Sequence, residues 1–552
     1  MKQKNTTYIC SIFLIFLFEG LFSQDSTLKI TSINKNDLNI LNKIEYKQHH
    51  SDSTSIYIEI NKVSSYLKNL GYFANTIDSI KNKKKTYIAY FSLNEKVDSI
   101  YIKVDPRLNI LTKNFKNENN IFSFPIDKLK SNLYNLTKKL DDEGKSFSKV
   151  HLKNIIIKNK TLFADLDIHQ SKKRVINKVI VKGYEDFPKS YIINYFKIKS
   201  NTIFNQQKIK EISNETKNLK FIKEIKPPEV LFTKDSTLLY MYLKKTQNNS
   251  FDGVINFSSK EDGGVLFNGN IDLKLNNIFN TGEKFELFWN SIREERQEFK
   301  LSTETPYLFN SKFSPQVSFS IYKQDSTFLN TKFDSKLFYN IGSKTKLALT
   351  YNSESSENLK QIINNNIETF NNYFWGFQFQ YRIPKNDFFF NDQFYFEINL
   401  TIGKRKTNQN SSNQFKIESS ASYIWDLNLR SSIYIKNTTG YLNSDSFIDN
   451  ELFRIGGANS IRGFNEQSIF TNSYTYFNFE YRYLTSEKSY FYTITDYSII
   501  DSNNSKKLGL GLGYMFFSKK TLINIAFAIG KENNTPFKTK NSKLIINLIN
   551  YF

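Results

Sequence analysis

Apolar residues recur at helical spacing in two places within the first 150 residues. Steps of three and four residues place each set on one helix face, and Gly71 and Gly144 stand where the predicted helices end. The two sets are Ile56, Ile60, Val63, Leu67 and Leu70, and Ile126, Leu129, Leu133, Leu136 and Leu140. Strand-like segments follow each helix and predict two β-hairpins, at residues 76–80 with 86–93 and 151–157 with 161–168.

A third segment also combines predicted helices and strands. An alternating strand at 175–181 is followed by a short helix from Pro188 to Phe196 and a second helix at 205–219. Pro227 and Pro228 then precede strands at 229–232 and 237–243. This order resembles the POTRA domain, as do the segments Leu70-Gly71-Tyr72-Phe73 and Ile180-Val181-Lys182-Gly183-Tyr184. We therefore expect three POTRA-like α+β domains, at 25–96, 97–172 and 173–248, with α+β domains of no such kinship as the alternative.

Beyond residue 249 the period changes to two. Phe394, Phe396, Ile398, Leu400 and Ile402 alternate with polar residues, so one strand face is apolar and the other polar. About 16 such segments divide the 304 residues of 249–552 into 19 residues each, which suits membrane-spanning strands of about 9–11 residues. The pattern predicts a transmembrane β-barrel of about 16 antiparallel strands over 249–552. A soluble β-sandwich, which also alternates, is the alternative.

The last segment has its apolar residues on one face and ends on an aromatic residue. Leu544, Ile546, Leu548 and Phe552 share that face, whereas Asn550 interrupts it. The ending resembles the C-terminal β-signal of Gram-negative outer-membrane proteins, with Leu548 and Phe552 as its signal residues.

The N-terminal residues predict an export signal. Lys2 and Lys4 precede an apolar run of eleven residues, Tyr8 to Phe18, which is too short to span a bilayer as a helix but fits a signal peptide over residues 1–24. The only cysteine of the chain, Cys10, lies in that run, so disulfide frameworks and cysteine zinc sites are excluded.

Charge divides the rest of the chain. Residues 25–248 contain 41 Lys and Arg against 23 Asp and Glu, a net charge of +18, whereas 249–552 contain 33 against 29, a net charge of +4. A basic half could serve nucleic acid, an anionic membrane or acidic clients. Export argues against nucleic acid, and the scattered lysines also fit a solvated surface without a dedicated partner.

One motif joins these features. The segment from Gly456 to Phe464 contains paired glycines and the tetrad Ile461-Arg462-Gly463-Phe464. It resembles the signature loop of the BamA/TamA superfamily, whose tetrad lies at the tip of an extracellular loop folded back into the barrel. A surface arginine in a flexible loop is the alternative.

The resemblance also assigns roles to residues after the tetrad. It implies that Asp496 is the lumen partner of Arg462, and that Glu480 and Arg482 form a strand motif. Tyr497 and Ser498 stand where the family has a glycine, so we expect the backbone to differ there. Gly509, Gly511 and Gly513 share one face of the next strand and would leave room for the loop.

The resemblance implies an outer-membrane protein assembly or translocation factor with its N-terminal domains in the periplasm. Its partners would be membrane lipids, unfolded outer-membrane or secreted clients, and periplasmic or lipoprotein assembly partners. The alternatives are a two-partner-secretion-type transporter for one dedicated client and a passive pore. All four histidines precede residue 170 and none has His-Glu-x-x-His spacing, which argues against a histidine-based catalytic or metal site. Spacing alone leaves a Ser/Lys or paired-carboxylate site open, but no feature of the sequence points to one, so we expect no catalytic residue, metal or cofactor.

Overall fold

The computed structural model describes residues 26–83, 85–106, 117–118, 120–259, 265–292, 296–360, 366–385, 387–500 and 505–552. The expected signal peptide and Cys10 lie outside these residues. The chain divides into two compact units, one with the residues up to Val175 and Ile203–Gln207, the other with Ile176–Thr202 and Lys208–Phe552. Among the described residues no helix is both long enough and apolar enough to cross a membrane.

The first unit begins with a four-stranded sheet of order β2-β1-β4-β3. Its elements are β1 (Ser26–Thr31), α2 (Lys35–Leu41), β2 (His49–His50), α3 (Ser53–Asn69), β3 (Thr76–Lys83) and β4 (Thr86–Ser92). The Asp52 carboxylate accepts the Ser55 backbone N–H at 2.7 Å and caps α3, and Gly71 beyond its end has a φ of +102°. The helix buries Ile56, Ile60, Val63 and Leu67, as the spacing predicts.

A partly buried carboxylate of α3, that of Glu59, ties the helix to the preceding segment. Glu59 accepts the Lys47 backbone N–H at 3.2 Å and the Lys62 ammonium at 3.0 Å. Partial burial acts to raise the pKa of Glu59, but these two donors outweigh it, and its pKa lies below the usual value.

The second sheet has five strands in the order β6-β7-β5-β9-β8, with β5 and β9 parallel. Its elements are β5 (Ser99–Lys103), β6 (Asn117–Glu118), β7 (Ile121–Pro125), a 3-10 turn (Ile126–Lys128), α5 (Leu129–Asp142), β8 (Lys149–Lys158) and β9 (Thr161–His169). The outermost strand β8 has ten residues, and Ile155, Ile156 and Ile157 in it are each about half exposed.

The third sheet, β11-β14-β13, belongs with the second unit, and a two-stranded pair β10-β12 accompanies it. The elements are β10 (Val175–Ile176), β11 (Lys178–Lys182), a π-helix (Tyr191–Tyr195), β12 (Thr202–Ile203), α6 (Gln206–Lys217), β13 (Ile222–Phe232) and β14 (Thr237–Lys245). One sequence prediction is wrong here, because β13 begins before Pro227 and Pro228 and contains them. Its register shifts between Lys226 and Glu229, so the two residues without an N–H lie at an irregularity of an edge strand.

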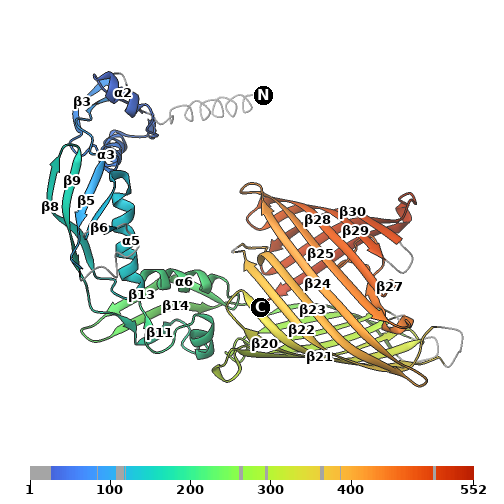
Figure 1. Ribbon diagram of the computed structural model, residues 1–552. Coiled ribbons are helices and arrows are strands. Elements are labelled where there is room, and N and C mark those ends of the chain that lie inside the picture. The colour runs from blue at the N-terminus through green and yellow to red at the C-terminus, as the bar shows by residue number, and fades with distance from the viewer. Residues whose placement is uncertain are drawn as a thin grey trace, which may run out of the picture. The chain divides into compact units, whose positions relative to one another are not determined.

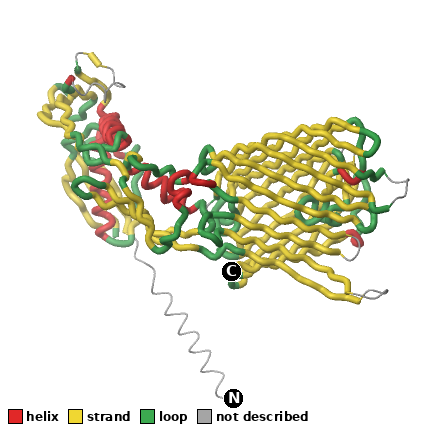
Figure 2. The backbone as a smooth tube through the Cα atoms, turned by 90° about the horizontal axis from the view of Figure 1, so that it is seen from below, coloured by secondary structure: helices red, strands yellow, loops and turns green. Residues whose placement is uncertain are grey.

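Sixteen strands of the second unit form a closed antiparallel barrel, in agreement with the predicted number (Figures 1 and 2). They are β15 (Ser250–Ser259), β16 (Val265–Asn276), β17 (Lys284–Ile292), β18 (Arg296–Glu304), β19 (Phe313–Gln324), β20 (Phe328–Asn340), β21 (Thr345–Asn358), β22 (Phe370–Pro384), β23 (Asp392–Thr407), β24 (Ser411–Asp426), β25 (Ser431–Ser444), β28 (Ser473–Ser486), β29 (Ser489–Ile500), β30 (Ser505–Ser518), β31 (Thr521–Glu532) and β32 (Ser542–Tyr551). The connection from β25 to β28 contains the short pair β26 (Phe453–Ile455) and β27 (Ile469–Thr471). Short 3-10 helices lie at Leu308–Asn310, Asp449–Glu451 and Thr539–Asn541.

The barrel is apolar outside and polar inside. In β23 Leu400 and Ile402 are 41% and 65% exposed, whereas Asn399 and Thr401 between them are buried. A protein surrounded by water would bury the opposite set, so this arrangement is that of a transmembrane barrel. Strands such as β23, with 16 residues, exceed the predicted 9–11, because a strand can continue beyond the bilayer.

Candidate functional site

The loop between β25 and β28 turns through glycines. Gly456, Gly457 and Gly463 have φ values of +109°, +99° and +93°, a region that side-chain-bearing residues rarely adopt. At Gly457 a Cβ atom would lie 1.9 Å from the Glu466 carboxylate, which accepts the Ala458 backbone N–H at 3.0 Å. Glycine at these positions lets the loop close on itself.

Arg462 is held by Asp496 of β29 through three hydrogen bonds. Its Nε and backbone N–H donate to Asp496 Oδ2, both at 2.8 Å, and its Nη2 donates to Oδ1 at 2.6 Å. Asn478 of β28 donates to the same Oδ1 at 2.8 Å and to the Ser460 carbonyl at 2.7 Å. Asp496 is fully buried and Arg462 nearly so, and the bidentate pair fixes the position of the guanidinium.

Glu480 of β28 extends this pair into a network. Its Oε1 accepts Arg462 Nη1 at 2.6 Å, and its Oε2 accepts both Nε and Nη2 of Arg482 at 2.7 Å. The Arg482 guanidinium lies 3.9 Å from the centroid of the Tyr434 ring and 4.6 Å from that of Phe390. Two arginines thus balance two carboxylates inside the barrel, which lowers the cost of burying each charge.

The tetrad lies against a wall of small residues. A Cβ atom at Gly463 would come within 2.6 Å of the Gly530 nitrogen in β31, and one at Gly530 would lie 2.8 Å from the Phe464 ring. A Cβ atom at Gly509 in β30 would lie 2.1 Å from the Arg462 carbonyl oxygen. The backbones of loop and wall therefore touch at glycines, as proposed for Gly509; Gly530 was not anticipated.

The structure corrects one expectation on these strands. Gly511 and Gly513 do not make room for the loop, because a Cβ atom would meet the Phe527 carbonyl at 2.1 Å and the Tyr492 ring at 2.2 Å. The backbone that follows Asp496 is a regular strand. Tyr497 and Ser498 continue β29 in regular register with both neighbouring strands, because the alternation sends Tyr497 outward and buries Ser498.

The remaining predicted residues lie apart from the network. Ile461 is fully buried and packs with Ile455, Tyr476 and Ile500. In the last strand Leu548 and, just beyond it, Phe552 are about half exposed on the outer side of the barrel. They share that side with Leu544 and Ile546, as the period of two predicts.

The base of the loop has a second anchor that the sequence did not reveal. Arg405 of β23 forms an ion pair with Glu451, whose other carboxylate oxygen accepts Gln414 Nε2 at 2.8 Å. The neighbouring Asn450 is fully buried and donates to Ser356 Oγ at 2.6 Å. Residues from segments far apart in the sequence make these contacts, so they could not be predicted from spacing along the chain.

A further group was missed in the second sheet. His151, Asp167 and His169 gather on β8 and β9, with their ligand atoms within 4.8 Å of one another. A His-Glu-x-x-His spacing lies within one segment, whereas these side chains meet through the pairing of two strands.

No protein-family model matches this chain, and no curated protein does. The structure is similar to CdiB from Acinetobacter baumannii, with a TM-score of 0.52, 14% identity and coverage of 89% of this chain and 97% of that chain. It is also similar to CdiB from Escherichia coli, with a TM-score of 0.51, 11% identity and coverage of 89% and 98%. BamA from Haemophilus ducreyi lacking POTRA domains 1–3 aligns with a TM-score of 0.46, 14% identity and coverage of 82% and 98%. The chain therefore has the fold of the CdiB structures, a 16-stranded barrel preceded by small α+β domains.

Proposed function

We propose that this protein is an outer-membrane assembly or translocation factor. Its α+β domains would lie in the periplasm and bind unfolded client chains, and its barrel would insert or pass them at the seam between the first and last strands. The mechanism needs no covalent step and no cofactor, since strand pairing itself supplies the driving force.

The observation that carries this proposal is the weakness of the seam. Among the described residues, two pairs join β15 to β32, Ser250 with Tyr551 and Phe251 with Asn550. By contrast, nine pairs join β31 to β32 and ten join β15 to β16. Most N–H and C=O groups along the facing edges of β15 and β32 thus lack the inter-strand pairing that joins the other neighbouring strands. These groups would be available to pair with a client strand.

An edge strand in the α+β domains fits client binding. β8 ends its sheet, and its Ile155, Ile156 and Ile157 remain exposed. An extended client chain could add beside β8 through main-chain hydrogen bonds, which tolerate many sequences, while the isoleucines supply apolar contact. In the third sheet the edge strand β13 contains Pro227 and Pro228, which have no N–H to offer, so β8 is the better docking edge.

Depletion of the protein followed by quantitative proteomics of the outer membrane tests the proposal. A general assembly factor predicts a broad fall in barrel proteins. Loss of a single exported protein would instead favour the transporter with one dedicated client, an alternative that the likeness to CdiB keeps open. Unchanged amounts of every outer-membrane and exported protein would overturn the proposal and leave the passive pore as the remaining alternative.

A further inference from the structure

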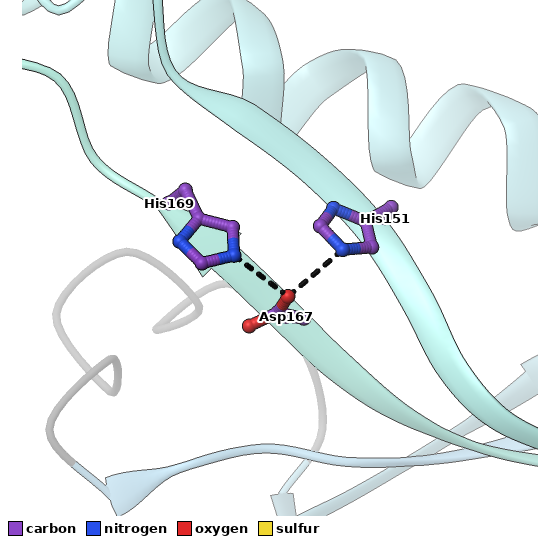
Figure 3. A group of neighbouring side chains, drawn as sticks. All are labelled: His151, Asp167 and His169. Atoms are coloured by element: carbon purple, nitrogen blue, oxygen red, sulfur yellow. Dashed lines mark ion pairs between the residues drawn. The ribbon is translucent and has the colours of Figure 1, made fainter.

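Two histidines and an aspartate converge on one face of the β8–β9 hairpin (Figure 3). His151 of β8 stands directly opposite Asp167 of β9, and Lys149 stands opposite His169. Asp167 and His169 are two residues apart in the same strand, so all three side chains project from one face. The two imidazole rings stack with centroids 5.7 Å apart and planes inclined by 21°.

The three side chains direct their ligand atoms toward one point. Nε2 of His151 lies 2.8 Å from Asp167 Oδ2, and Nε2 of His169 lies 3.1 Å from the same oxygen. That oxygen is shielded from solvent, and the Lys153 ammonium also lies beside it. Two imidazole nitrogens therefore face one carboxylate oxygen.

A backbone irregularity creates this convergence. From the turn, the ladder pairs Lys158 with Thr161, and regular continuation would set His151 opposite Ile168. The register instead shifts by one residue between Lys153 and Ile156, where Asn154 has a φ of +52°. Such a bulge exchanges the faces of a strand, and here it turns His151 toward Asp167.

The ligand set is one that transition metals prefer. Zinc binds imidazole nitrogen at about 2.0–2.1 Å and carboxylate oxygen at about 2.0–2.2 Å, so tetrahedral ligands are separated by about 3.3 Å. The nitrogen–oxygen separations of 2.8 and 3.1 Å need only small rotations of the two imidazole side chains, which are 43% and 66% exposed, to reach that value. Three protein ligands leave one position for water or another donor.

The Lys153 ammonium is the competitor of a metal at this place. Its Nζ lies 2.5 Å from Asp167 Oδ2, and its side chain is half exposed. A lysine side chain of that kind can turn into solvent and keep its charge hydrated there. A bound dication would then replace the ammonium as the counter-charge of the carboxylate.

We propose that His151, Asp167 and His169 form a binding site for a divalent transition-metal ion, with Zn²⁺ as the best fit to two nitrogens and one oxygen. The ion would link β8 to β9 across the ladder, on the N-terminal side of the bulge. The site is independent of the proposed function in protein assembly.

Titration of the purified, untagged, full-length protein in detergent with ZnCl₂ after chelator treatment tests this site. We expect one equivalent of Zn²⁺ to bind, and His169→Ala and Asp167→Asn each to weaken binding at least about tenfold, since even indirect partners of a metal contribute that much. Lys153→Ala should leave the affinity intact or raise it. His49→Ala serves as the control, because His49 is exposed in another sheet and should not affect binding.

Two results would overturn the proposal. One is the absence of a bound equivalent at micromolar Zn²⁺, and the other is unchanged affinity in His169→Ala. X-ray absorption at the zinc edge of the unmodified protein with one equivalent of Zn²⁺ is a second test that needs no variant. It should show two imidazole ligands, and a spectrum without them would place the ion elsewhere.

Discussion

Loss of the Arg462 side chain should release the loop from the barrel wall. Arg462→Ala removes three hydrogen bonds to carboxylates, two to Asp496 and one to Glu480, each 2.6–2.8 Å long. Removing one partner of a buried ion pair costs about 3–5 kcal/mol, because the remaining charge stays buried and uncompensated. Asp496 is fully buried, but the backbone N–H of residue 462 and the Asn478 amide can still donate to it. We therefore expect the lower end, about 3 kcal/mol, which corresponds to about a hundredfold rise in the undocked population.

Protease access to the loop measures this population directly. A glutamate-specific protease can cut after Glu466 once the loop leaves the lumen, and the cutting rate follows the open fraction when opening and closing are fast. Arg430→Ala is the matched control, since Arg430 is exposed in the turn between β24 and β25. Adding Asp496→Asn to Arg462→Ala should restore part of the loss, because the buried negative charge is then also removed.

A cutting rate in Arg462→Ala within about twofold of the unmodified protein would refute the argument, since it would mean an energetic contribution of about 0.4 kcal/mol or less. A rise of equal size in Arg430→Ala would refute it too, because the effect would then not depend on the buried network.

Three further outcomes are expected. Gly463→Ala should also release the loop to the protease, because its Cβ would lie 2.6 Å from barrel backbone at a φ of +93°, whereas Gly342→Ala, with only a lysine tip at 3.7 Å, should not. Ile156→Asp should reduce photo-crosslinking of clients to β8 severalfold, and Ile33→Asp, at a residue that is more exposed (86% against 51%) and lies outside any strand, should leave it unchanged. Because the pKa of Glu59 is lowered in the folded state, its ionised carboxylate stabilises the first sheet and α3 at pH values above 4.5, the pKa in the unfolded state. This stabilisation is lost as the pH falls through the folded-state pKa. The difference in thermal midpoint between Glu59→Gln and the unmodified protein should therefore vanish in acid.

The features that depended on local pattern were predictable from the sequence. The period of two in β23 identified the lipid-facing residues, because alternation in a strand assigns faces without knowledge of its neighbours. The stripe of α3 and its ending at Gly71 followed equally from local rules. The pairing of Arg462 with Asp496 followed from resemblance alone, since 34 residues separate them.

The features that depended on register or on distant segments were not predictable. His151 meets Asp167 only because a bulge shifts the register of β8 and β9 by one residue. The alternation of apolar and polar residues along β8 does not predict that shift. The contact of Gly463 with Gly530 and the ion pair of Arg405 with Glu451 arise from the closure of the barrel, which brings distant segments together.

Locking the seam tests the central claim most directly. Cysteines at Phe251 and Asn550, which face each other across β15 and β32, can be oxidised in a chain whose Cys10 is replaced by Ser. The control places cysteines at Ile525 and Ile546, which are paired in the continuous ladder between β31 and β32. We predict that oxidation of the seam pair reproduces the client loss seen on depletion, that reductant reverses it, and that the control pair has no effect. Full client assembly with a quantitatively oxidised seam would contradict the account.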